Sequence, residues 1–157
     1  MEMLILKQKK MMKYWQIIVV IIFIWIGFVC AISFMEAWLK FQAPGITLPL
    51  GLGIGRLVFH VLNKVEWVFA ISIILATLLD KDKSTIGLIA FSVAFSILCI
   101  QTFYLLPILD LRAACIIAGE KSAPSKAHFI YIFIEALKVI ALFTLGIKTL
   151  PKSTSTE

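Results

Sequence analysis

The amino-acid sequence predicts an all-α polytopic membrane protein with four transmembrane helices in an antiparallel bundle. Of its 157 residues, 61% are hydrophobic and 15% are charged, and the mean hydropathy is +1.01. Ordinary soluble domains are about 45 to 50% apolar and about 25% charged, so the composition argues against a soluble or disordered chain. Because one crossing takes about 20 apolar residues, four crossings use up the sequence. Residues 1–157 are therefore expected to form a single transmembrane domain.

The first and second helices are predicted over about residues 14–35 and 55–79. The first is a long apolar run that follows several lysines. A secretory signal peptide has a similar start, but its apolar part is typically about 7 to 15 residues, so this longer run predicts an uncleaved helix. The second helix carries charged and polar residues in its first half and is apolar from Trp67 onward.

The third and fourth helices are predicted over about residues 85–109 and 127–147. A hydrophilic turn at residues 80–84 separates the second helix from the third. Pro107 is expected to kink or end the third helix, because an internal proline removes a backbone hydrogen bond. Pro151 and a polar tail follow the fourth helix.

The connection between the first two helices, at about residues 41–55, is unusual. Its sequence, FQAPGITLPLGLGIG, is too apolar for an ordinary loop and too rich in Gly and Pro for a continuous helix. An interfacial or re-entrant connection fits this pattern, and the sequence leaves open whether it re-enters the membrane. The glycines at 51, 53 and 55 do not form the GxGxxG turn of a dinucleotide site, so we expect them to serve close helix approach.

The basic residues predict that both termini lie in the cytoplasm. Cytoplasmic loops are enriched in Lys and Arg, and this orientation gives the cytoplasmic side the larger number. The expected location is the bacterial inner membrane. Because the basic residues lie at helix ends and loops, the net charge of +6 indicates topology and lipid contact, not a nucleic-acid partner. The cytoplasmic side would carry Lys7, Lys9, Lys10, Lys13, Lys81, Lys83, Lys148 and Lys152, and the other side Lys40, Arg56, Arg112, Lys121 and Lys126, with Lys64 as a sixth.

Polar residues of the predicted helices gather in the non-cytoplasmic half. Several recur at spacings of three or four, which place them on one helix face, and charges are expected to turn away from lipid because exposing them there is costly. The three stripes are Ser33, Glu36 and Lys40; Arg56, His60, Asn63 and Trp67; and His128, Tyr131, Glu135 and Lys138. The candidate ligand-binding residues are Glu36, Arg56, His60, Asn63, Glu66, Gln101, Tyr104, His128, Tyr131 and Glu135.

Some of these side chains have a simpler interpretation. Residues near helix ends also occur as interface markers whose long side chains reach water. Glu66 and Glu135 lie roughly 10 to 15 Å deep at 1.5 Å per residue, beyond the reach of a carboxylate, so a functional or network role is favoured for these two. The residues that fit the interfacial interpretation are Lys40, Arg56, Asp110, Arg112 and His128.

Two functional hypotheses follow from the cluster. In the first, it binds a small ligand, such as a lipid- or quinone-like molecule, or forms part of a proton or solute path. Arg56 would hold an anionic group, and His60, Glu66 and Glu135 would exchange protons. In the alternative, the ionic network is structural, and the protein is a non-catalytic accessory subunit of a membrane complex or a homo-oligomer.

No motif identifies a reaction or a cofactor. His60 and His128 could ligate haem or a metal ion, but both lie near one surface and neither HExxH nor CxxC is present. We therefore assign no metal site and leave the cofactor open. No spacing selects an acid and base pair, so a non-enzymatic role is favoured. The cysteines, Cys30, Cys99 and Cys115, lack CxxC pairing.

The stretch FMEAWLKF at residues 34–41, followed by GRLVFH at residues 55–60, resembles small bacterial four-helix membrane proteins of unknown function, the TMEM-type family with a domain of unknown function. In that family a first helix ends in a short aromatic-rich apolar connection, and a Gly or Arg plus Phe pattern opens the second. The resemblance covers about the first half of the chain, and Lys64 and Glu66 depart from it. It implies only an integral inner-membrane protein and names no site.

Overall fold

The structure is a computed structural model that describes residues 2–78, 85–120 and 126–154, with side chains over 16–78, 85–120 and 126–150. All regular secondary structure in these ranges is helical. Four segments are long and apolar enough to span a membrane, so the prediction of an all-helical chain with four such helices is confirmed. The predicted turn at 80–84 lies outside the described residues. The four segments are Gln16–Gln42, Leu48–Leu78, Thr85–Ile117 and Ala127–Leu150.

Two of the four segments contain a π-helical stretch, so each is divided into several elements. The elements in chain order are α1 (Glu2–Val29), the π-helix η1 (Cys30–Glu36), α2 (Ala37–Leu39), the 3₁₀-helix η2 (Lys40–Gln42), α3 (Leu48–Leu78), α4 (Thr85–Ile100), the π-helix η3 (Gln101–Leu105), α5 (Leu106–Ile117) and α6 (Ala127–Thr154).

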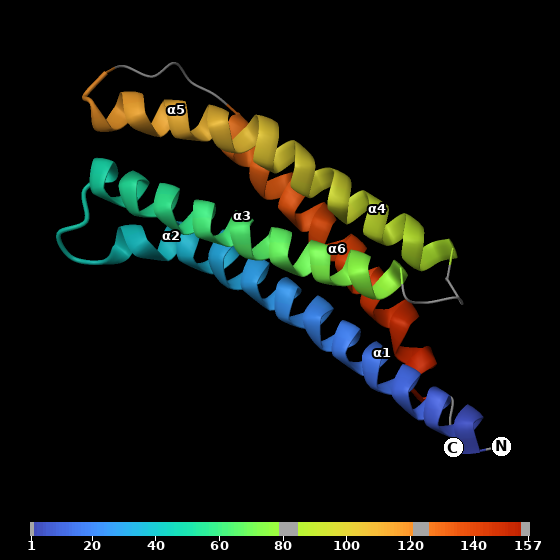
Figure 1. The fold of residues 1–157 in the computed structure, drawn as a ribbon. Coiled ribbons are helices and arrows are strands. Elements are labelled where there is room, and N and C mark those ends of the chain that lie inside the picture. The colour runs from blue at the N-terminus through green and yellow to red at the C-terminus, as the bar shows by residue number, and fades with distance from the viewer. Residues whose placement is uncertain (1, 79–84, 121–125, 155–157) are drawn as a thin grey trace.

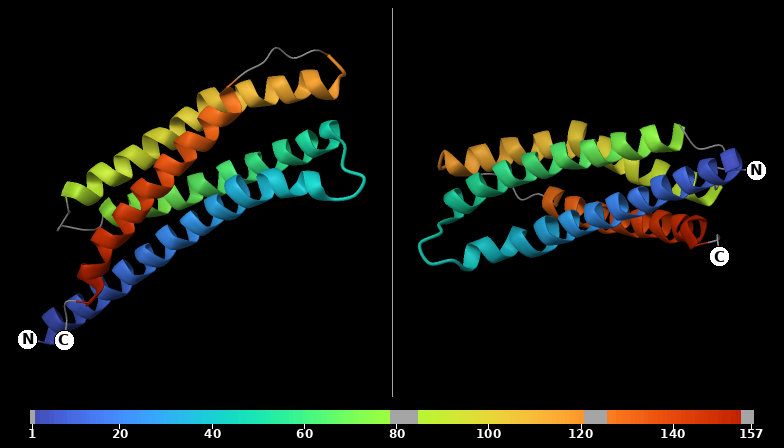
Figure 2. Two further views of the ribbon diagram at one scale, coloured as in Figure 1. Left: turned by 180° about the vertical axis from the view of Figure 1, so that it is seen from behind. Right: turned by 60° about the horizontal axis from the view of Figure 1, so that its bottom comes forward.

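The helices lie alongside one another over most of their length (Figures 1 and 2). Helix α6 packs against α1 and α4, and α3 packs against α5 and α1. Both chain termini lie at one end of the molecule, which we call the terminal end (Figure 1). Helix α2, the beginning of α3 and the end of α5 lie at the other end, which we call the far end.

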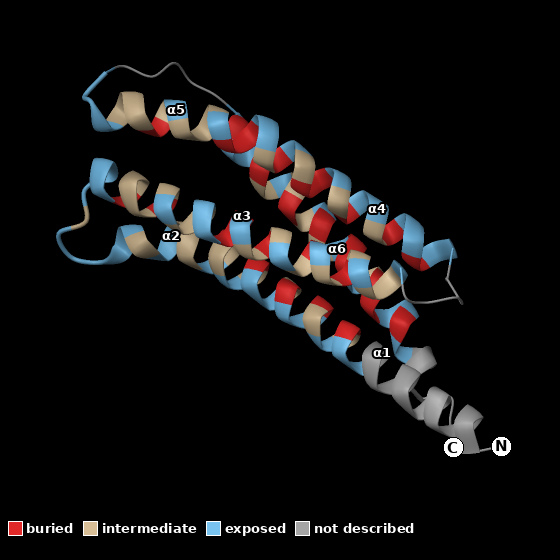
Figure 3. Cartoon of the chain, viewed as in Figure 1, coloured by how far each residue is buried: buried red, intermediate tan, exposed pale blue. Residues whose placement is uncertain are grey.

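The main apolar core occupies the half of the molecule nearer the termini. Buried residues line the facing sides of α1, α4 and α6 there (Figure 3). Small residues such as Ala90 and Ala94 bring α4 close to α6, as is typical of helix contacts in membrane proteins. The buried members of this core are Ile18, Ile22, Trp25, Val29, Ala70, Ile73, Ala90, Ala94, Leu98, Ala141, Leu142 and Leu145.

Helix α3 begins at Leu48, about seven residues earlier than the sequence analysis placed it. The hydroxyl of Thr47 accepts a hydrogen bond from the backbone N–H of Leu50 (3.4 Å), which caps the helix, and proline is tolerated in a first helical turn, where Pro49 lies. The glycines inside the helix provide space: a Cβ on Gly51 would collide with the Phe41 ring. Much of the connection predicted at 41–55 is therefore helix.

The third segment continues through Pro107 to Ile117 and does not end near residue 109. The π-helix η3 directly precedes α5, and Pro107 lies in the first turn of α5. Proline is tolerated there, because the N–H that it lacks would have no partner within the new helix.

Candidate functional site

The polar residues that the sequence places in one half form two separate groups. One is a buried network around Lys138, at the end of the main core. The other lines a pocket at the far end of the molecule.

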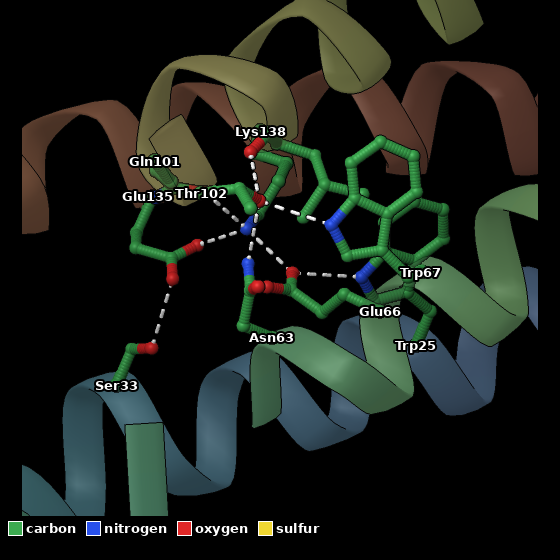
Figure 4. Close-up of polar contacts among 10 residues, drawn as sticks. Trp25, Ser33, Asn63, Glu66, Trp67, Gln101, Thr102, Glu135 and Lys138 are labelled. Carbon is green, nitrogen blue, oxygen red and sulfur yellow. Dashed lines mark hydrogen bonds and ion pairs between the residues drawn. The ribbon is translucent and has the colours of Figure 1, made fainter. Parts of the chain in front are cut away.

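Lys138 is the centre of the buried network and is 0% exposed. Its Nζ lies 2.5 Å from Glu66 Oε1 and 2.8 Å from Glu135 Oε2. It also donates a hydrogen bond to Gln101 Oε1 (2.6 Å). An ammonium group has three N–H donors, and here three acceptors from α3, α6 and η3 surround it (Figure 4). The Lys138 side chain is therefore surrounded by one oxygen from each of these three elements.

The two carboxyl groups differ in how their oxygens are used. Trp25 Nε1–H donates to Glu66 Oε1 (2.9 Å), the same oxygen that contacts Lys138. Ser33 Oγ–H donates to Glu135 Oε1 (3.1 Å), while the other oxygen of Glu135 contacts Lys138. Among the described residues, three buried atoms lack a hydrogen-bond partner: Glu66 Oε2, Gln101 Nε2 and Glu135 Oε2, the last of which still has its ion-pair contact with Lys138. The hydrogen bonds of the network are thus incomplete at these three atoms.

Both π-helices contribute to the network, Ser33 from η1 and Gln101 from η3. π-Helical turns are rare and occur frequently at functional sites. Next to Gln101, the hydroxyl of Thr102 accepts hydrogen bonds from Asn63 Nδ2 (2.9 Å) and Trp67 Nε1 (3.0 Å) and donates to the Leu98 carbonyl (2.8 Å). This hydroxyl is fully used and fixes η3 against α3.

The pocket at the far end has a volume of about 360 Å³. Side chains of α2, η2, α3, α5 and α6 line it, and most of them are apolar. The ionisable side chains in its lining are Lys40, Arg56, Asp110, Arg112, His128 and Tyr131. The lining therefore joins an apolar wall to a cationic group of residues.

Ion pairs hold part of this group in place. Lys40 Nζ lies 3.2 Å from Glu36 Oε2, and Arg56 Nε lies 3.3 Å from Asp110 Oδ1. His60 Nε2 contacts the other oxygen of Asp110 at 2.5 Å. Arg112 is the third cationic side chain of the pocket lining.

Tyr131 lies between the pocket and the network. It lines the pocket, is 1% exposed, and precedes Glu135 by one helical turn on α6. Its ring packs edge-on against Phe59 at 5.4 Å, and Leu105 and Leu106 complete this second apolar cluster. The pocket lining at Tyr131 is therefore one turn of α6 away from the buried carboxyl group of Glu135.

The structure divides the ten candidate residues between the two groups. Tyr104 joins neither, because it is 64% exposed. Gln101 and Tyr104 share a face in an α-helix, but η3 is π-helical, which turns the two side chains apart. The network contains Glu66, Gln101 and Glu135 with Asn63 beside it; Arg56, His128 and Tyr131 line the pocket, and Glu36 and His60 pair with residues that do.

Several residues of the two groups are not among the ten candidates predicted from the sequence. Lys40, Asp110 and Arg112 fit an interfacial interpretation by their position near helix ends, yet they line the pocket. Nothing in the sequence marks Trp25 and Thr102 as site residues, because tryptophan and threonine are common in apolar helical segments. Lys138 could have been included, because its spacing continues the polar stripe of His128, Tyr131 and Glu135.

The arrangement consists of a pocket with ionisable side chains in its lining and a buried network of two carboxyl groups and one lysine, and it does not by itself name a ligand. Among the described residues, no three His, Cys, Asp or Glu side chains converge as a metal site. The resemblance to small four-helix membrane proteins stays a prediction. Comparison with known protein families, with characterised proteins and with solved structures gives no match for this chain.

Proposed function

We propose that the four apolar segments cross a bilayer as an antiparallel bundle, and that the pocket binds an amphiphile with an anionic head and an apolar tail. The observation that carries this proposal is the pocket itself, about 360 Å³ of space with three cationic side chains in a largely apolar lining. Ligand sites are commonly 300 to 1,000 Å³, apolar, and supplied with a few polar groups. With both termini cytoplasmic, the pocket would face the other side of the membrane.

The charges favour a carboxylate or phosphate head. Arg56 is held by Asp110 through Nε, and its side chain is 40% exposed. Its two terminal nitrogens lie outside that ion pair and form the planar fork that suits an oxyanion. Lys40 and Arg112 line the same pocket, so an anionic head there would lie near two further cationic side chains.

The remaining lining favours an apolar tail. Phe41, Leu52, Phe59, Leu106, Leu109 and Ile116 all contribute to the pocket. Burying apolar surface against them contributes roughly 25 cal/mol per Å². A fully polar solute would leave these apolar side chains with no apolar group to pack against, so an amphiphile fits better than a small hydrophilic ion.

A series of ligands with one tail and different heads tests the proposal. Protein purified in a non-ionic detergent is titrated with dodecyl phosphate, lauric acid, dodecanol and dodecyltrimethylammonium, and binding is followed by the shift in thermal stability. We expect saturable stabilisation by the two anionic compounds only. Equal stabilisation by dodecanol would show that the head is not recognised, and the proposal would fail.

Variants of α3 locate the binding site. Arg56→Gln is expected to weaken dodecyl phosphate binding by about 10- to 100-fold, because a hydrogen bond to a charged group contributes about 1.5 to 3 kcal/mol. Lys64→Gln removes the same charge from the exposed face of the same helix and should leave binding unchanged. Native mass spectrometry after reconstitution in phosphatidylglycerol or phosphatidylcholine then tells a retained anionic lipid from a free amphiphile.

A second candidate function, as a subunit of a membrane complex, is favoured by one observation. Lys64 is exposed near the middle of α3, and among the described residues none forms an ion pair with it. Apart from His60 one turn earlier, most exposed side chains along this face are apolar. The apolar ones are Leu57, Val61, Val68, Ile71, Leu75 and Leu78. A charge on a lipid-facing stripe is costly, and a partner helix that carries Asp or Glu at this depth would offset it.

A further inference from the structure

The charges of the buried network do not balance. Lys138 supplies one positive charge, and Glu66 and Glu135 would supply two negative charges if both were ionised, with all three side chains 0% exposed. An isolated charge in an apolar interior is strongly disfavoured, and such groups neutralise instead. One proton on a carboxyl group would make the network neutral.

The surrounding elements bring no second cation. From α1 and η1 the neighbours are Trp25, Ser33 and Cys30, whose thiol lies close enough to Glu135 to interact with it. From η3 they are Gln101 and Thr102, and α6 adds Tyr131. Cys30 and Tyr131 are the titratable members of this set, and neither can supply a positive charge. Among the described residues, therefore, no second cationic side chain balances the network, and a proton on one carboxyl group would do so without any other ion.

The hydrogen bonds indicate which carboxyl group carries it. Glu135 Oε1 accepts a hydrogen bond from Ser33, and Glu135 Oε2 has no hydrogen bond but lies 2.8 Å from Lys138 Nζ, which is its ion-pair partner. Glu66 takes both of its donors on Oε1 and leaves Oε2 buried and unpartnered. A charged oxygen without a partner is the most costly atom to bury, so a neutral carboxylic acid is favoured at Glu66.

We propose that the Glu66, Lys138 and Glu135 network is a proton-binding site that holds one exchangeable proton on Glu66. The site is reached from the pocket side. Toward the terminal end, the apolar core that contains Ala70 and Leu142 closes it off, while toward the far end Tyr131, which is part of the pocket lining, lies one helical turn before Glu135 on α6. The inference needs no ligand in the pocket and stands independently of the proposed function.

Infrared spectroscopy of the full chain tests this directly. A protonated carboxyl group has a C=O stretching band that is separate from the carboxylate bands and shifts in D₂O. The protein is measured at neutral pH in a maltoside detergent, which has no carbonyl group. We expect one such band in the wild type and none in Glu66→Gln, which copies the neutral form of Glu66 and should keep the fold.

Two further variants test the charge balance. In Lys138→Met the cation is gone, so both carboxyl groups should hold protons and the band should double. In Glu135→Gln the remaining carboxyl group becomes the counter-ion of Lys138, so the band should disappear. Glu36→Gln is the matched control, because Glu36 pairs with Lys40 at the pocket and is partly exposed; its band should equal that of the wild type.

Several outcomes would overturn the inference. A wild-type protein without the band would carry a net negative network of structural character. A band that survives in Glu66→Gln would place the proton on another group, and one that survives in Glu135→Gln would contradict the charge balance. Should Lys138→Met fail to fold, the wild type and the two Gln variants still decide the question. None of these results depends on whether amphiphiles bind.

Discussion

Lys64 and Glu66 lie two residues apart on α3 and have opposite environments. Glu66 points into the molecule toward Lys138, and Lys64 is exposed. Residues two apart on a helix do not share a face, so the exposure of Lys64 follows from the burial of Glu66. One of the two charges therefore requires a partner inside the chain, and the other requires water, lipid headgroups or a second protein.

Charge substitutions at Lys64 separate these possibilities. If a partner helix offers a carboxylate, the complex extracted from membranes by a mild detergent should shrink to the size of the chain alone in Lys64→Glu, because like charges then meet. Lys64→Arg keeps the charge and should keep the complex. Native gel electrophoresis measures both. A wild-type protein that already migrates alone would remove the subunit role.

At the scale of the elements, the π-helices explain why the polar stripes divide. Ser33 and Glu36 share a face in an α-helix, but η1 is π-helical. Ser33 reaches the network while Glu36 pairs with Lys40 at the pocket. Hydrophobic periodicity does not reveal a single π-helical turn, and this is why the sequence analysis joined two sites into one.

The glycines of α3 provide a test of how its first turns pack. A Cβ on Gly53 meets nothing within 4 Å, whereas one on Gly51 collides with the Phe41 ring of the pocket wall. Gly53→Ala is expected to raise stability by about 0.5 to 1 kcal/mol, because alanine is the better helix former. Gly51→Ala should give no such gain and should weaken dodecyl phosphate binding. Equal behaviour of the two variants in thermal melts and titrations would contradict this packing.

At the scale of the whole molecule, the proposed topology is open to labelling. The chain without its three cysteines is given one new cysteine, Ala43→Cys, in the exposed connection before α3. We expect a membrane-impermeant maleimide to label it in intact cells, and a fluorescent protein fused to the C-terminus to fold in the cytoplasm. Labelling only after permeabilisation would show that the bundle is inverted.

The sequence predicted the number of long helices, because the length of each apolar run indicates one helix. It also predicted the half of the molecule where polar residues gather, because the positions of the charged residues along the helices indicate it. It did not predict which residues meet. That depends on how far each helix is shifted along its neighbours, and on the π-helical turns. Asn63 and His60 illustrate this, since they are one turn apart and contact Thr102 and Asp110 respectively.

The apolar core on the terminal side also determines where a membrane potential would act. A field concentrates across the part of a bilayer that lacks water and charge, and moving one elementary charge through 100 mV changes its energy by about 2.3 kcal/mol. In the proposed topology that insulating part is the core around Ile22 and Leu142, on the cytoplasmic side of Glu66. A proton entering from the pocket would cross little of the voltage. Its occupancy would follow the acidity outside the cell and respond only weakly to the electrical state of the membrane.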